Sequence, residues 1–130
     1  MVHMQQAALV VGVQAVGQQI PFLLLEVPTQ TTQEETISKI GSIAHSGSST
    51  DVDCGFSNGA RFVMLKRTDA TGDWYYWDSV RGIIAGNDPY LLLNSNAAHV
   101  TNTDLIDPLS SGFQISGDFT DGTYIFYAIA

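Results

Sequence analysis

The sequence predicts an all-β protein: a single β-sandwich or jelly-roll-like domain with an apolar N-terminal strand or arm. The chain has 130 residues, the size of one domain, with 45% hydrophobic and only 14% charged residues. This composition is too apolar for disorder and too poor in charge for a typical helical bundle. Short β-prone runs also alternate with turn signals such as Asn58-Gly59 and Asp121-Gly122. That spacing indicates roughly seven to nine strands in two layers.

From residue 37 onward the expected strands follow in close succession. They lie at residues 37–44, 51–56, 62–65, 74–77, 90–93, 113–116 and 123–130. The continuous apolar run Phe62-Val63-Met64-Leu65 predicts a strand covered on both faces. A turn at residues 68–72 returns the chain as the next strand, and this pair is the strongest hairpin signal.

The connections between these strands are polar. Loops are expected at residues 45–49 and 57–59, and a glycine-containing loop at residues 81–88. Residues 94–102 form a polar connection with room for a short helical turn. The strand at 123–130 ends in small or hydrophobic residues only, which predicts burial of its end.

The first third of the chain differs in composition, so we expect a boundary between a segment 1–36 and a domain 37–130. Residues 7–25 are uncharged and largely apolar, and the polar residues 29–36 read as a linker. Gln14, Gln18 and Pro21 interrupt the apolar run, and no Lys or Arg precedes it. We therefore expect neither a membrane span nor a signal peptide.

Two β-prone pieces remain in that segment, at residues 8–16 and 20–27. Pro21 and Pro28 bracket the second piece, which places it at a sheet edge or against another chain. The pieces are either ordinary sandwich strands or an arm that binds neighbouring subunits, because apolar side chains are costly to leave in water. The candidate attachment residues are Val10, Val11, Val13, Phe22, Leu23 and Leu24.

Charge and composition argue against several function classes. The net charge is -8 with only five Lys and Arg, so no basic stripe is available for nucleic acid. The single cysteine, Cys54, is expected to be a small buried thiol. His3, His45 and His99 are expected to be solvated loop residues rather than catalytic bases. No nucleophile elbow, phosphate loop or zinc-protease motif is present, so we expect no enzyme activity.

Acidic pairs in the expected loops raise the question of calcium. They are Asp51 with Asp53, Asp104 with Asp107, and Asp118 with Asp121. None has the spacing of an EF-hand, and aspartates that cap nearby N–H groups explain the same pattern. We expect neither a metal nor a cofactor.

The aromatic run Trp74-Tyr75-Tyr76-Trp77 is the main candidate for contacts. On a strand, Trp74 and Tyr76 share one face, while Tyr75 and Trp77 share the other. One face is expected to be core; the other is core of a second layer, a subunit interface or a platform for a sugar ring. Tyr90 joins this candidate set. Arg81 is expected to pair with Asp78 beside the strand.

The same segments carry a family resemblance. The quoted motifs are FVMLKRTD at 62–69, GDW at 72–74, WDS at 77–79 with Arg81, YLLLNSNAA at 90–98 and TYIFYAIA at 123–130. Together they resemble an uncharacterised β domain that recurs in tail-fibre and other virion proteins of tailed bacteriophages. The resemblance covers about residues 37–130 and is structural, because its motifs identify no catalytic group.

The resemblance implies a non-enzymatic structural protein on the surface of the virion tail or head. The leading expectation is a tail-fibre or adhesin component that attaches through its N-terminus and presents loops to a host-surface glycan. The alternative is a capsid decoration or cement protein bound to the major capsid lattice, and a tail-associated depolymerase is a third, less favoured hypothesis. Expected partners are other virion proteins and further copies of the chain, with a trimer suggested by analogy to phage fibres. Neither nucleic-acid binding nor membrane insertion is expected.

Overall fold

The computed structural model of the chain describes residues 9–10, 24–25 and 35–130. The chain divides into two units, residues 1–35 and 36–130. In the first unit, strand β1 (Leu9–Val10) pairs antiparallel with β2 (Leu24–Leu25). Each strand lies within one of the two pieces expected to be β-prone. The candidate attachment residues Val11, Val13, Phe22 and Leu23 lie outside the described residues.

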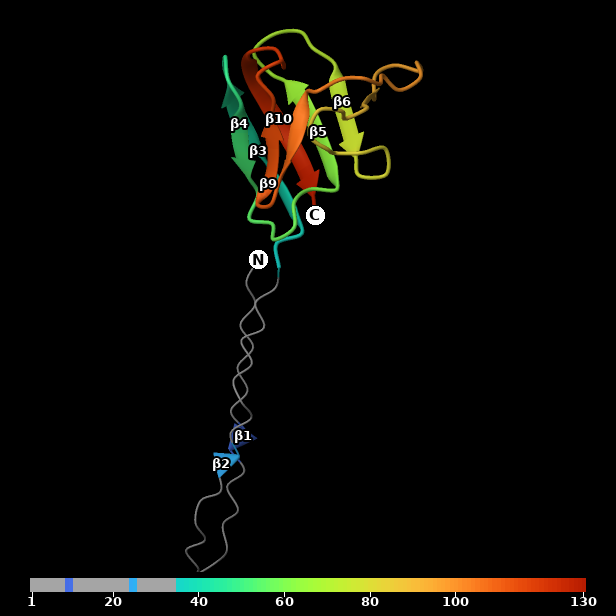
Figure 1. Cartoon of the computed structure of the whole chain (residues 1–130). Helices are drawn as coiled ribbons and strands as arrows, with labels where there is room; N and C mark the ends of the chain where they lie inside the picture. Colours follow the sequence, from blue (N-terminus) through green and yellow to red (C-terminus); the bar gives the residue numbers. More distant parts are fainter. Residues whose placement is uncertain (1–8, 11–23, 26–34) are drawn as a thin grey trace, which may run out of the picture. The chain divides into compact units, whose positions relative to one another are not determined.

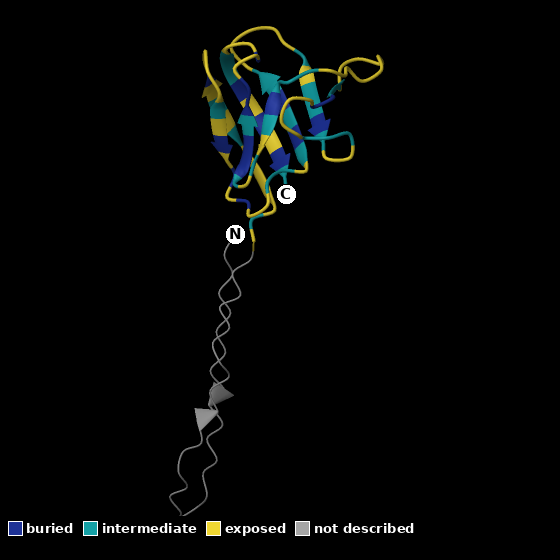
Figure 2. Ribbon diagram, in the orientation of Figure 1, coloured by how far each residue is buried: buried dark blue, intermediate teal, exposed yellow. Residues whose placement is uncertain are grey.

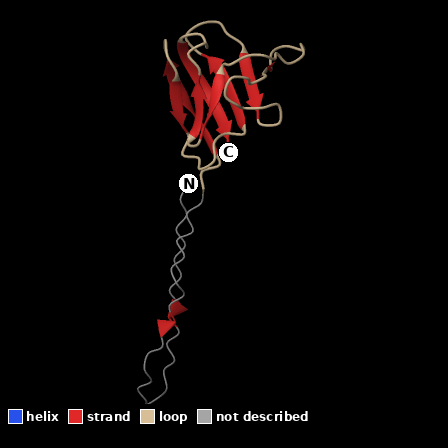
Figure 3. Ribbon diagram, in the orientation of Figure 1, coloured by secondary structure: helices blue, strands red, loops and turns tan. Residues whose placement is uncertain are grey.

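The second unit contains two antiparallel sheets (Figures 1 and 3). The five-stranded sheet has the order β3-β10-β5-β6-β7, and the three-stranded sheet the order β4-β9-β8. The strands are β3 (Ser38–His45), β4 (Thr50–Asp53), β5 (Phe62–Arg67), β6 (Trp74–Asp78), β7 (Leu91–Leu92), β8 (Ile106–Leu109), β9 (Gly112–Ile115) and β10 (Gly122–Ile129). The described residues include no helix. That part of the chain therefore also lacks a helix that could cross a membrane. The prediction of an all-β sandwich is confirmed.

The C-terminal strand, β10, lies in the interior of the larger sheet, between two partner strands. β10 pairs with β3 on one side and with β5 on the other, so that Tyr127 lies opposite both Ile40 and Met64. β5 and β6 form the predicted hairpin, with Met64 opposite Tyr76. At the end of β10, Ala128 is fully buried and Ala130 half-buried. The expected burial of this end therefore holds for Ala128 but only in part for Ala130.

The core lies between the two sheets. Figure 2 shows buried and exposed residues alternating along β10, as expected for a strand with one covered face. Phe113 of β9 meets Phe126 of β10 across the layers, with ring centroids 5.8 Å apart. The large, fully buried hydrophobic side chains are Trp77, Phe113, Leu65, Ile106, Ile115, Val52 and Val63.

The structure corrects three expectations about strands and loops, and a fourth about a histidine. β5 is covered on one face only, because Val63 and Leu65 are buried while Phe62 and Met64 are half-buried. The strand β8, which contains Pro108, was not expected. No helical turn forms at residues 94–102, which contain bends, turns and one bridging residue.

His45 is the fourth correction, because it is buried rather than solvated, with only 2% of its surface exposed. It is the last residue of β3 and faces the interior. Its Nε2 donates to the carbonyl oxygen of Phe119 at 3.2 Å, and its Nδ1 lies 2.8 Å from Thr50 Oγ1. These contacts fasten the β3–β4 turn to the loop before β10. His99 is exposed in a loop, as expected.

Candidate functional site

The side of the five-stranded sheet turned away from the core, here called the outer face, is apolar. Strand register aligns its side chains in rows across the sheet. The middle row contains Ile40, Tyr127, Met64, Tyr76 and Leu91. The flanking rows contain Ser42, Ile125, Lys66 and Trp74 on one side, and Ser38, Ile129, Phe62 and Asp78 on the other. Lys66 and Asp78 are thus the charged residues at these strand positions.

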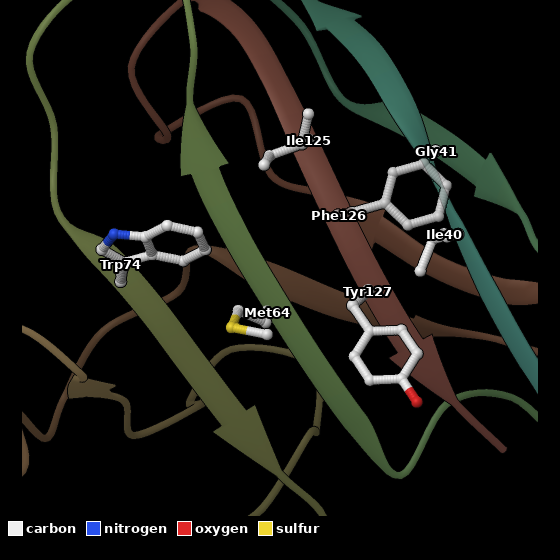
Figure 4. A pocket seen from close by; sticks show the side chains of 7 residues that line it. All are labelled: Ile40, Gly41, Met64, Trp74, Ile125, Phe126 and Tyr127. Atoms are coloured by element: carbon white, nitrogen blue, oxygen red, sulfur yellow. The ribbon is translucent and has the colours of Figure 1, made fainter.

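Several of these apolar side chains are open to water. The exposed fractions are 72% for Ile40, 41% for Ile125, 38% for Trp74 and 37% for Tyr127. Figure 4 shows them extending from β3, β10 and β6, with Met64 of β5 between them. They line a hollow of about 530 Å³. A contiguous apolar surface of this kind marks an interaction site more often than isolated exposed residues do.

Aromatic contacts fix the side chains near Phe62, at one end of the outer face. The Phe62 ring lies 4.9 Å from that of Tyr76 and 5.8 Å from that of Tyr127, measured between centroids. The Arg81 guanidinium lies 5.0 Å from the Tyr76 ring centroid, a cation–π contact. Its Nη2 also donates to Asp78 Oδ2 at 2.6 Å. The predicted Arg81–Asp78 pair is therefore confirmed, and it neutralises the carboxylate on the outer face.

The opposite outer surface, formed by the three-stranded sheet, is acidic and polar. Register places Asp51, Gln114 and Asp107 in one row. The Gln114 amide donates to Asp51 Oδ1 at 2.7 Å, and Asp53 accepts the N–H of Gly55 at 2.9 Å. The two outer surfaces of the sandwich therefore differ in kind: the three-stranded sheet presents several acidic side chains, and the five-stranded sheet is mainly apolar.

The expected alternation of the four aromatics is confirmed, and it separates their roles. Trp77 is fully buried, and its ring stacks on the half-buried Tyr75 at 5.6 Å. Tyr90 lies 5.1 Å from Tyr75 in the same cluster. These three candidate contact residues belong to the core side of the sheet, so only Trp74 and Tyr76 are placed on the outer face.

The sequence reasoning missed the part of this surface that β3, β5 and β10 contribute. Ile40, Met64, Ile125 and Tyr127 come from three strands that are distant in the chain. The available signal was the alternation in β10, where Ile125 and Tyr127 flank the buried Phe126. That pattern places two large apolar side chains on the face opposite to the core.

A smaller, polar pocket of about 120 Å³ lies at one end of the sandwich, where the β5–β6 turn meets the loop before β10. It is lined by Arg67, Thr71, Gly72, Asp73, Tyr75, Phe119, Thr120 and Tyr124. The Tyr124 hydroxyl donates to the Thr120 carbonyl at 2.7 Å. Arg67 Nε donates to Asp69 Oδ1 at 2.6 Å, and this hydrogen bond lowers the pKa of Asp69. The pocket combines hydrogen-bonding groups with aromatic walls.

Two further titratable groups, Asp88 and Cys54, are buried in the interior. Asp88 is fully buried and accepts the N–H groups of Leu105 and Ile106 at 3.0 and 2.7 Å, while burial raises its pKa to about 6. Cys54 is buried as expected, and burial, with the nearby charge of Asp53, raises its pKa to about 11. Within the described part of the chain, no group of three or more His, Cys, Asp or Glu is placed to hold a metal.

The fold defines a two-layer β-sandwich domain with one apolar and one acidic outer surface. Residues 30–130 match the model of a domain of unknown function, DUF7483, and the chain belongs to that family. No curated protein and no solved structure matches the chain.

Proposed function

We propose that the chain is a non-enzymatic structural protein of a bacteriophage virion, namely a tail-fibre or adhesin component. The sequence resemblance to a domain of phage tail-fibre and virion proteins supports this function. The observation that carries the proposal is the apolar outer face, with Ile40 and Ile125 exposed to 72% and 41%. A protein that works by assembling with other chains needs such a surface.

The loop end of the sandwich supports the adhesin role. Its polar pocket brings Arg67 and Asp73 beside Tyr75 and Tyr124. Hydrogen-bonding groups next to aromatic rings suit the hydroxyls and apolar faces of a sugar. We propose that these loops contact a host-surface glycan, and that many copies on one particle provide avidity.

A capsid decoration protein is the second candidate. The uncharged apolar stretch of residues 7–25 favours it, because such an arm suits burial between subunits of a lattice. In this alternative, the chain binds the major capsid protein and stabilises the particle instead of recognising a host.

The test is a cryo-electron-microscopy reconstruction of the virus that carries the protein, with the sandwich fitted into the density. Density at the tail or fibre tips is the expected result. Density over the capsid lattice would replace the adhesin by the decoration protein, and absence of the chain from purified particles would refute both.

Glycan recognition is tested separately with the full chain on a glycan array. Arg67→Gln is expected to weaken any glycan signal at least tenfold, because Arg67 lines the polar pocket. Arg61→Gln is the matched control, since Arg61 precedes β5 at its opposite end and its Nη2 donates to the Ala130 carbonyl. Equal signals from the two variants would exclude this pocket as the glycan site.

A further inference from the structure

We propose that the outer face of the five-stranded sheet binds the same face of a second copy of the chain, forming a face-to-face pair. This inference rests on the proposed function, since it names one partner in the assembly. Its starting point is the exposed group Ile40, Trp74, Ile125 and Tyr127 around Met64. In such a pair, these side chains leave water together.

Charge favours a second copy on this face. The chain carries 13 acidic and 5 basic residues, so most surfaces of two copies repel each other. A symmetric contact places a patch against itself, and therefore tolerates no unpaired like charge at its centre. The outer face meets this condition at its centre, because the middle row is uncharged and Asp78 is paired with Arg81. Its other charged residue, Lys66, lies in a flanking row, where its Nζ donates to the Arg67 carbonyl at 3.0 Å.

The other outer surface fails the same condition. A symmetric contact there would bring Asp51, Asp53 and Asp107 of one copy against the same carboxylates of the other. Like charges placed face to face cost several kcal/mol. The difference between the two surfaces thus selects the five-stranded sheet for self-association and leaves the three-stranded sheet in water.

The size of the face fits a reversible pair. Five strands about 4.8 Å apart give a width of about 20–24 Å, and rows from Phe62 to Lys66 with their side chains span about 20 Å. Each copy therefore covers roughly 450 Å², and the pair roughly 900 Å², close to the lower limit of about 1,000 Å² for a specific interface. The association should be modest and depend on concentration. The hollow of about 530 Å³ provides room for side chains to interdigitate between sheets.

The first experiment is sedimentation velocity of the full chain over a broad dilution series. The expected species has twice the 14.0 kDa mass of the chain. Ile125→Ser is expected to weaken association at least tenfold. Val100→Ser is the matched control, because Val100 is similarly exposed, 39% against 41%, but bridges Tyr90 on the core side of the sheet. Circular dichroism checks that both variants fold.

The second experiment identifies the surface through the only two tryptophans of the chain. Trp74 lies on the outer face and Trp77 is fully buried. Acrylamide quenching of wild-type fluorescence is expected to fall as the pair forms, because Trp74 becomes covered. In Trp74→Phe, which keeps an apolar ring on the face, only Trp77 reports, and quenching should not change with concentration.

Several outcomes would overturn the inference. They are a monomer at every concentration, a trimer, an association unaffected by Ile125→Ser, and an association that leaves Trp74 quenching unchanged. An association unaffected by Ile125→Ser, or one that leaves Trp74 quenching unchanged, would mean that the copies meet at another surface or that the outer face binds a different protein. The proposed function is judged independently on virions: a monomeric chain found on the tail would refute the pair alone, and a pair absent from particles would refute the function alone.

Discussion

The rings of Tyr75 and Trp77 stack with centroids 5.6 Å apart and planes inclined by 11°, on the core side of β6. Phe119 stands edge-on to both rings, at 5.0 and 6.1 Å. The aromatic run is therefore divided by the pleat of one strand, with a core anchor on one side and an exposed ring, Trp74, on the other.

This division predicts unequal effects of two tryptophan substitutions. Trp77→Ala removes a fully buried side chain and should lower the free energy of unfolding by about 3–5 kcal/mol. Trp74→Ala, at a 38% exposed position, should cost less than about 1 kcal/mol in the monomer. Urea unfolding at low protein concentration measures both, and equal losses would contradict the assignment.

Gly112 should tolerate no side chain. A Cβ at this first residue of β9 would overlap the carbonyl oxygen of Val52 on the paired strand. Since backbone cannot yield as a flexible side chain does, Gly112→Ala should cost more than about 2 kcal/mol. Gly47→Ala is the control. Gly47 has a φ of +68°, and a Cβ added there would meet nothing within 4 Å. Only the left-handed backbone conformation should then destabilise the variant, by about 1–2 kcal/mol. Similar thermal midpoints for Gly112→Ala and wild type would refute the overlap.

Asp88 should make stability depend on pH. Burial raises its pKa to about 6 in the folded chain, against about 3.9 in an unfolded one, so the folded state holds the proton more tightly. The stabilisation from Asp88, its contribution to the free energy of unfolding, is fully present below about pH 4 and is lost as the pH rises through about 6. The loss should reach about 1–3 kcal/mol at neutral pH, from about 1.4 kcal/mol per pKa unit.

The measurement for Asp88 is chemical unfolding of wild type and Asp88→Asn between pH 4 and pH 7. The variant keeps the shape of the side chain but cannot ionise, so its stability should vary less over this range. The pKa of Asp69 is lowered, so this residue changes its protonation below the pH range of the experiment. It is also present in both proteins, so it cannot account for a difference between them. Parallel curves would show that Asp88 does not titrate as expected.

Cys54 should react slowly with thiol reagents while the chain is folded. Its pKa of about 11 keeps the sulfur protonated at neutral pH, and only 1% of the residue is exposed. Labelling by a chromogenic disulfide should therefore follow unfolding, and should be faster in Trp77→Ala. Rapid, stoichiometric labelling of the folded wild type would contradict this expectation.

Local patterns were enough to predict most of the sandwich. The β5–β6 hairpin follows from two β-prone runs around a turn, and Phe113 with Ile115 follows from simple alternation. β8 was missed because Pro108 reads as a strand breaker. The structure places β8 at a sheet edge, where a residue without an N–H is tolerated.

The candidate surface was harder to predict, because it depends on strand order. A continuous apolar run such as that of β5 has the same pattern whether both faces are covered or only one is. The position of Met64 on the outer face can be inferred only once Tyr127 and Tyr76 are known to flank it on neighbouring strands. Similarly, alternation separates Trp74 from Trp77, but it cannot tell which of the two faces the other sheet.

The place of β10 has a consequence for biosynthesis. β3 and β5 are made early, yet neither pairs with the other, because β10 (Gly122–Ile129) lies between them. During translation, both strands must therefore wait with unpaired edges until residue 129 has left the ribosome. A nascent chain stalled before that point exposes unpaired backbone N–H and C=O groups along these strand edges. Premature termination within β10 should therefore yield an aggregation-prone fragment that chaperones must hold.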